Sequence, residues 1–115
     1  MNTKTQQVEQ LPANTAPIQN LLRDRIRREP GFTGIMLKEA VECLLQNDVI
    51  TAQLILRDIT NCTIGFKALA RATGIMEKSL MRMLSVKGNP QAKNLFQIIY
   101  SLQQLNEVSL EIRAG

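Results

Sequence analysis

The chain has 115 residues, a net charge of +4, 44% hydrophobic residues and 21% charged residues. This length leaves room for one domain, and the composition argues against collagen, a coiled coil and a wholly disordered chain. Histidine is absent and only 3% of the residues are aromatic, which argues against histidine-dependent catalysis and against aromatic platforms for single-stranded nucleic acids.

The composition also argues against a metalloenzyme and a membrane protein. Cys43 and Cys62 are far apart in apolar helical segments, so we interpret both as core residues and expect no metal site and no cofactor. The ten carboxylates include no pair beside a basic partner at a catalytic spacing, which predicts that the protein is not an enzyme. No apolar run approaches the ~18 residues of a membrane span, and we expect a cytoplasmic protein.

The N-terminal part is predicted to be an arm followed by an arginine-rich helix. Residues 1–16 are rich in Thr, Gln, Asn and Pro and are expected to be flexible. From Pro17, apolar residues recur at helical spacing until Glu29-Pro30-Gly31, which ends the helix. A solvated helix face is the simplest interpretation of its charged residues, which are Arg23, Asp24, Arg25, Arg27, Arg28 and Glu29.

Residues 17–115 are expected to form one helical domain with five further helices. Apolar residues spaced by three or four predict helices over residues 34–46, 49–61, 66–73, 77–84 and 92–106. Asp48 is the expected N-cap of the second of these.

Apolar and polar residues alternate from Val108 to Ile112, as in a half-buried strand. A single strand cannot satisfy its own backbone groups. We therefore expect it to pair with a second copy across a two-fold axis, or to join the sheet of another protein. The contact would be made by Val108, Leu110 and Ile112. A frayed tail is the alternative.

Residues 66–84 have the spacing of a helix-turn-helix. Ala70 provides a small residue where two steeply crossing helices come closest, and Gly74 provides the left-handed turn between them. The residues expected to face inward are Leu69, Thr73, Ile75, Leu80 and Met83. A helical bundle that uses the same turn only for packing is the alternative.

The charge of this region favours DNA binding. Between Phe66 and Lys93 there are six basic residues and one acidic residue, an excess larger than the net charge of the whole chain. In the second helix, four residues lie off the buried face and are predicted to contact base edges: Glu77, Lys78, Met81 and Arg82. The predicted phosphate contacts are Lys67, Ser79, Lys87, Asn89 and Lys93.

With these features, residues 36–113 resemble the Xre/Cro-like helix-turn-helix antitoxins, in particular the HigA-like group called probable addiction module antidote proteins. The resemblance is carried by the segments 37–40, 52–59, 69–75, 79–80, 83–85 and 88–90, the last of which reads Gly-Asn-Pro. It implies a repressor-type five-helix domain that forms a homodimer on an inverted-repeat operator of double-stranded DNA. It also implies binding to a small RelE/ParE-superfamily toxin, repression of the protein's own operon, and a place in the bacterial cytoplasm at the nucleoid.

The chain departs from that family at the start of the second helix. Met76 stands where Ser or Thr usually caps the helix, Glu77-Lys78 reverses the commoner order of charges, and Met81 stands where Tyr is frequent. The preferred base sequence therefore does not transfer. The first 35 residues exceed the usual family length, and toxin binding, DNA backbone contact and packing all remain open for them.

Overall fold

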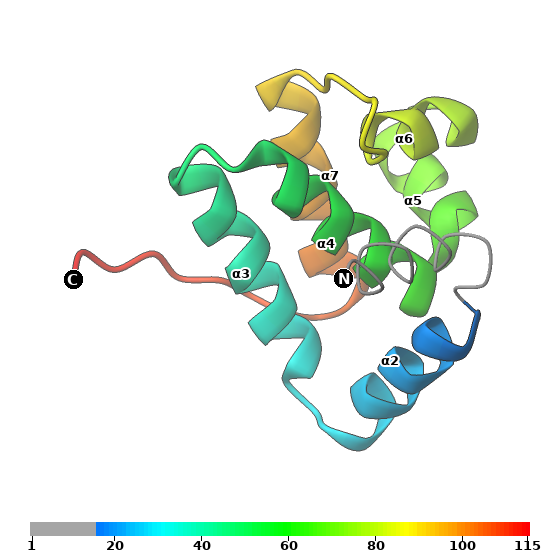
Figure 1. Cartoon of the computed structure of the whole chain (residues 1–115), viewed down its shortest axis with the longest axis vertical. Coiled ribbons are helices and arrows are strands. Elements are labelled where there is room, and N and C mark those ends of the chain that lie inside the picture. Colours follow the sequence, from blue (N-terminus) through cyan, green and yellow to red (C-terminus); the bar gives the residue numbers. More distant parts are fainter. Residues whose placement is uncertain (1–15) are drawn as a thin grey trace, which may run out of the picture.

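The computed structural model describes residues 16–115, which form six helices (Figure 1). They are α2 (Ala16–Arg28), α3 (Phe32–Leu45), α4 (Val49–Cys62), α5 (Gly65–Thr73), α6 (Glu77–Met83) and α7 (Ala92–Leu105). The predicted all-α class is confirmed, and every predicted helix is present with ends within two residues of the expected ones. The predicted arm lies outside the described residues, except for Ala16, which begins α2.

The core joins five of the helices. Helix α4 packs against α2, α3 and α5, and α5 packs against α6 and α7. Each helix from α3 to α7 contributes a fully buried leucine, and these are Leu37, Leu56, Leu69, Leu80 and Leu102. Burying one such side chain contributes about 1.5–3 kcal/mol, so the short helices α5 and α6 are held mainly by the core. In residues 16–115, no helix is long and apolar enough to cross a membrane.

The start of α4 follows the prediction. The Asp48 carboxylate accepts a hydrogen bond from the backbone N–H of Thr51 at 3.2 Å, as an N-cap does. The preceding Asn47 has a φ of 64°, a left-handed conformation that asparagine tolerates better than most residues. This pair allows α3 and α4 to join through a short turn and to pack side by side (Figure 1).

Helix α2 lies across the C-terminal end of α4. The Arg23 guanidinium donates a hydrogen bond to the carbonyl oxygen of Asn61 at 2.9 Å, one of the last α4 carbonyls that lack a partner within the helix. Leu22 and Ile26 are half-buried, whereas Leu21 is exposed. Helix α2 is thus docked on the domain without contributing to its buried core.

The predicted strand at residues 108–112 does not form within the single chain, because residues 16–115 contain no strand. Its pairing with a second copy or with another protein stays a prediction. A strand needs a neighbouring strand to accept and donate its hydrogen bonds, and none lies beside this segment. Instead, two backbone N–H groups of the segment donate to Gln103. The N–H of Val108 donates to the backbone carbonyl of Gln103, and the N–H of Leu110 donates to the side-chain oxygen of Gln103, both at 2.9 Å. The segment runs along α3 to a C-terminus that projects beyond the helices (Figure 1).

The expectation that both cysteines belong to the core holds for one of them. Cys62, at the end of α4, is buried, whereas Cys43 on α3 is only half-buried.

Candidate nucleic-acid interface

Thr73 and Gly74 fix the turn between α5 and α6. Gly74 has a φ of 75°, and its N–H donates to the carbonyl of Ala70 at 2.8 Å. The Thr73 hydroxyl donates to the carbonyl of Leu69 at 2.9 Å and accepts from the N–H of Ile75 at 3.2 Å. The predicted left-handed glycine is confirmed, and a side chain at this position would cost about 1–2 kcal/mol.

Helix α7 holds the same turn from the other side. The Gln97 side chain donates a hydrogen bond from Nε2 to the carbonyl oxygen of Thr73 at 2.8 Å. This carbonyl belongs to the last turn of α5, where the helix itself provides no donor. The direction in which α6 leaves α5 is therefore set by α5, the turn and α7 together.

Helix α6 has one buried side and one accessible side. Leu80 is fully buried, while Lys78 and Arg82 are exposed, Met81 is 48% exposed and Glu77 is partly exposed. The four residues predicted to contact bases thus all have accessible side chains on a single short helix.

The N-terminus of α6 shows the consequence of the methionine at position 76. Met76 has an extended backbone conformation suited to an N-cap, but its side chain makes no capping hydrogen bond and is 74% exposed. The Glu77 carboxylate in the first turn interacts favourably with the positive end of the helix dipole. This interaction compensates in part for the missing capping hydrogen bond.

The residues predicted to contact phosphates lie on α6 and on the elements next to it in the chain. Lys67 is exposed on α5, Lys87 and Asn89 are exposed in the loop after α6, and Lys93 is exposed in the first turn of α7. Ser79, on α6 itself, is half-buried.

Sequence reasoning missed Gln53, which organises the loop carrying Lys87 and Asn89. Gln53 lies on α4 and is 1% exposed. Its Nε2 donates to the carbonyl oxygens of Met83 at 2.7 Å and Ser85 at 3.0 Å, and lies 3.4 Å from that of Gly88. The available signal was a polar residue between the core positions Ala52 and Leu56 of an amphipathic helix.

Gly88 allows this loop to fold tightly against the end of α6. A Cβ atom at this position would overlap the carbonyl oxygen of Arg82 and would lie 2.9 Å from that of Met83. The loop backbone therefore packs directly on the α6 backbone, an approach that only glycine permits.

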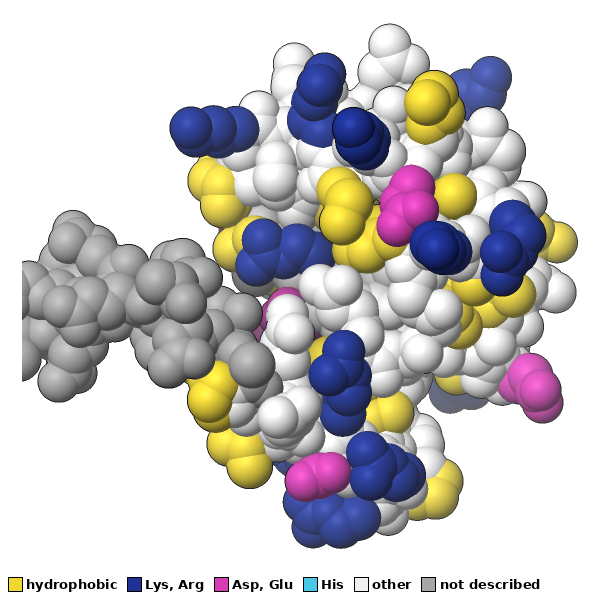
Figure 2. Space-filling view, turned by 90° about the vertical axis from the view of Figure 1, so that its right-hand side faces the viewer, with side chains coloured by type: hydrophobic (Ala, Val, Ile, Leu, Met, Phe, Trp, Pro, Cys, Tyr) yellow, Lys and Arg dark blue, Asp and Glu magenta, His cyan; other side chains and the backbone are white. Residues whose placement is uncertain are grey.

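The positive charge of the protein is concentrated in two segments of the chain. Figure 2 shows many Lys and Arg side chains and few acidic ones on the face formed by α5 and α6 and continued by α2 at its foot. Residues 66–93 carry an excess of five positive charges and residues 16–31 an excess of two, whereas the remaining described residues carry an excess of three negative charges. A face of this kind attracts a polyanion.

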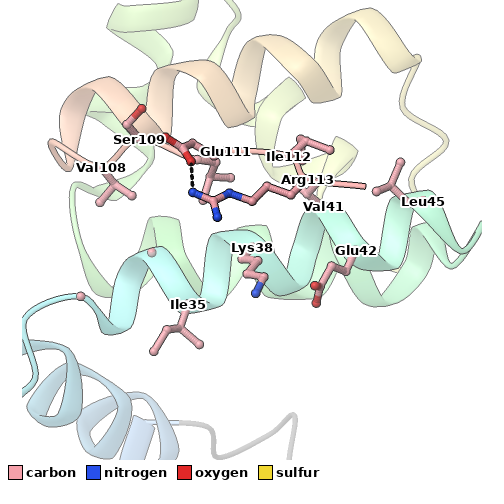
Figure 3. Close-up of a pocket in the computed structure, with 13 residues that line it drawn as sticks. Ile35, Lys38, Val41, Glu42, Leu45, Val108, Ser109, Glu111, Ile112 and Arg113 are labelled. Carbon is pink, nitrogen blue, oxygen red and sulfur yellow. Dashed lines mark hydrogen bonds and ion pairs between the residues drawn. The ribbon is translucent and has the colours of Figure 1, made fainter. Parts of the chain in front are cut away.

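On the other side, the C-terminal segment and α3 form a groove of about 600 Å³. Val108 and Leu110 are half-buried against the core, whereas Ile112 is 72% exposed, so the three residues of the predicted contact do not share one environment. Figure 3 shows the segment lying alongside α3, with the Arg113 side chain folded back to form an ion pair with Glu111 at 3.2 Å. The apolar side chains of Ile35 and Leu45 are exposed on the α3 side of this groove.

The part of the chain that the structure describes contains no cluster of three or more Cys, Asp or Glu residues able to hold a metal ion. Comparison of the chain with known protein families, curated proteins and solved structures finds no match. The function is therefore inferred from the residues of the site.

Proposed function

We propose that the protein is a sequence-specific regulator that binds double-stranded DNA through α5 and α6. The observation that carries this proposal is the accessible side of α6, where Lys78, Met81 and Arg82 project from a helix whose direction is fixed by the Thr73–Gly74 turn. A helix held in this way can enter a major groove, where Arg recognises guanine through two hydrogen bonds. The surrounding lysines supply the phosphate contacts.

We further propose the features that the resemblance to the HigA-like antitoxins implies. The protein would act as a homodimer with a repressor-like helix-turn-helix fold on an inverted-repeat operator, with half-sites about 34 Å apart. It would act at the nucleoid in the cytoplasm as the antitoxin that represses its own operon. The hydrogen bonds that connect α6 and the turn before it to α4, α5 and α7 support the part of the proposal that concerns base recognition, because base recognition requires a helix of defined orientation.

The test is fluorescence anisotropy on DNA from directly upstream of the gene and on a scrambled duplex, at several salt concentrations. We expect preference for the upstream DNA and a linear fall of log K with log salt concentration. The Arg82→Ala substitution should cost about 1–3 kcal/mol on the preferred site and relax its sequence preference. Lys87→Ala, the matched control, should weaken binding to both duplexes equally. Equal losses on both duplexes for Arg82→Ala would refute the base contact, and equal weak binding of the unmodified protein would refute the function.

The groove between α3 and the C-terminal segment favours a second candidate function, the binding and neutralisation of a RelE/ParE-like toxin with weak or no DNA binding. Exposed Ile35, Leu45 and Ile112 border this groove, and extended segments often receive a partner strand. Co-purification with the product of the neighbouring gene tests it. We expect Ile112→Asp to abolish complex formation and Met81→Asp to leave it intact. If Ile112→Asp does not affect capture of the partner, this groove is not the toxin-binding site.

A further inference from the structure

We infer that α2 is a second phosphate-binding element, which extends the DNA contact beyond α5 and α6. This inference rests on the proposed function, since it concerns the same DNA ligand. Its starting observation is that the arginines of α2 and the basic residues around α6 lie on one face of the protein (Figure 2). Nothing in the helix-turn-helix spacing requires this, because α2 precedes that region by more than 35 residues.

The dimensions of the face fit a DNA duplex. The longest dimension of the protein is 41 Å, and α6 and α2 lie toward opposite ends of it (Figure 1). One turn of B-DNA extends over about 34 Å. A duplex that follows this axis could therefore be contacted by α6 in a major groove and by α2 at its backbone within about one turn.

The orientation of α2 is fixed by two of its arginines, which are already engaged. Arg23 is hydrogen-bonded to the end of α4, and Arg25 forms an ion pair with Glu29 at 3.1 Å and stacks over the Phe32 ring at 4.2 Å. Arg23 thus holds α2 against α4, and Arg25 connects the last turn of α2 to the start of α3.

The other two arginines are available to a ligand. Arg28 is exposed and forms no ion pair with any residue in 16–115. The Arg27 side chain is 74% exposed, and its guanidinium forms an ion pair with the Asp24 carboxylate at 3.5 Å. Such exposed pairs contribute at most about 1 kcal/mol, so a phosphate can replace the carboxylate. Arg27 and Arg28 are therefore the residues that we assign to this contact.

The experiment measures the salt dependence of DNA binding by the full chain and its variants. Each phosphate contact contributes about 0.9 to the slope of log K against log salt concentration. We expect the double substitution Arg27→Gln and Arg28→Gln to make the slope shallower by about 1.8, equally on upstream and scrambled DNA. Arg27→Lys with Arg28→Lys keeps both charges and should retain the slope. Lys38→Gln, in the groove beside the C-terminal segment, should leave the slope unchanged.

The outcomes separate this inference from the proposed function. If the unmodified protein fails to bind DNA, the proposed function is wrong. If it binds upstream DNA and the Gln variant retains the original slope, α2 is not a phosphate contact and the proposed function stands. A lower melting temperature with an unchanged slope would show that the arginines only stabilise the C-terminal end of α2, and this also overturns the inference.

Discussion

Replacing Gly88 by alanine tests the connection between the core and the loop that carries Lys87 and Asn89. The added Cβ would overlap the carbonyl oxygen of Arg82 and lie 2.9 Å from that of Met83, where ordinary contact begins at 3.4 Å. Both neighbours are backbone atoms at the end of α6 and cannot rotate away. The loop must move, and its movement disrupts the acceptors of the Gln53 side chain.

The expected cost follows from these two effects. Overpacking of a close contact costs about 1–3 kcal/mol, and each weakened hydrogen bond about 0.5–1.5 kcal/mol. We expect Gly88→Ala to lower the free energy of unfolding by roughly 2–4 kcal/mol. For a domain of this size, that corresponds to a fall in melting temperature on the order of 10–15 °C. Thermal unfolding followed by circular dichroism measures it.

Gly74→Ala is the matched control, because the two glycines are required for different reasons. Gly74 has a φ of 75° and no atom within 4 Å of a Cβ atom built there, so alanine should cost only the conformational strain of about 1–2 kcal/mol. Gly88→Ala should therefore be the more damaging substitution. In a Gln53→Leu background the cost of Gly88→Ala should shrink, since the hydrogen bonds it disrupts are already absent. A Gly88→Ala variant as stable as the unmodified protein would refute this explanation. Fully additive costs of Gly88→Ala and Gln53→Leu would refute it as well.

Two further predictions concern α4 and the helix docked on it. Burial raises the pKa of Asp58 above its usual value of 3.8, although nearby Arg57 opposes the shift. The folded state therefore binds the Asp58 proton more tightly than the unfolded state does. The stability that this proton contributes is lost as the pH rises through the pKa of the folded state. Asp58→Asn should therefore gain stability relative to the unmodified protein between pH 3 and pH 7 in urea titrations, and a difference independent of pH would contradict the shift. Arg23→Met removes the hydrogen bond to Asn61 and should weaken the docking of α2 by roughly 1–2 kcal/mol, seen as faster amide hydrogen exchange in α2 but not in α5. Arg28→Met is its control, and equal exchange in both variants would count against Arg23 as the anchor.

The sequence was sufficient to predict the helices and the turn that matters most. Apolar residues recurring every three or four positions define each buried face, and this periodicity depends only on helix geometry. Gly74 was recognisable because a left-handed residue after a short helix is a local requirement. Asp48 was recognisable for the same reason, since an N-cap bonds to a residue three positions away.

The features that the sequence did not reveal depend on residues far apart in the chain. The acceptors of Gln53 lie 30 or more residues away, and the contact that requires glycine at position 88 depends on how the loop returns to α6. The C-terminal segment was predicted as a strand because its alternation is correct for one, but alternation does not supply a pairing partner. The orientation of α2 follows from Arg23 and the end of α4, a contact over 38 residues.

The two candidate binding surfaces lie on different parts of the molecule, so binding to DNA and binding to a protein partner do not exclude each other. The basic face of α2, α5 and α6 carries the positive excess, whereas α3 and the C-terminal segment belong to the part with a negative excess (Figures 1 and 2). A DNA duplex and a protein partner could therefore bind one chain together without sharing a contact. Helices α4 and α7 both connect the two sides. Helix α4 packs along α3 and holds the loop after α6 through Gln53, and α7 binds the C-terminal segment through Gln103 and the turn before α6 through Gln97. Any influence of a partner in the groove on DNA affinity within a single chain should therefore pass through these two helices, and Gln53→Leu should weaken the part that α4 carries.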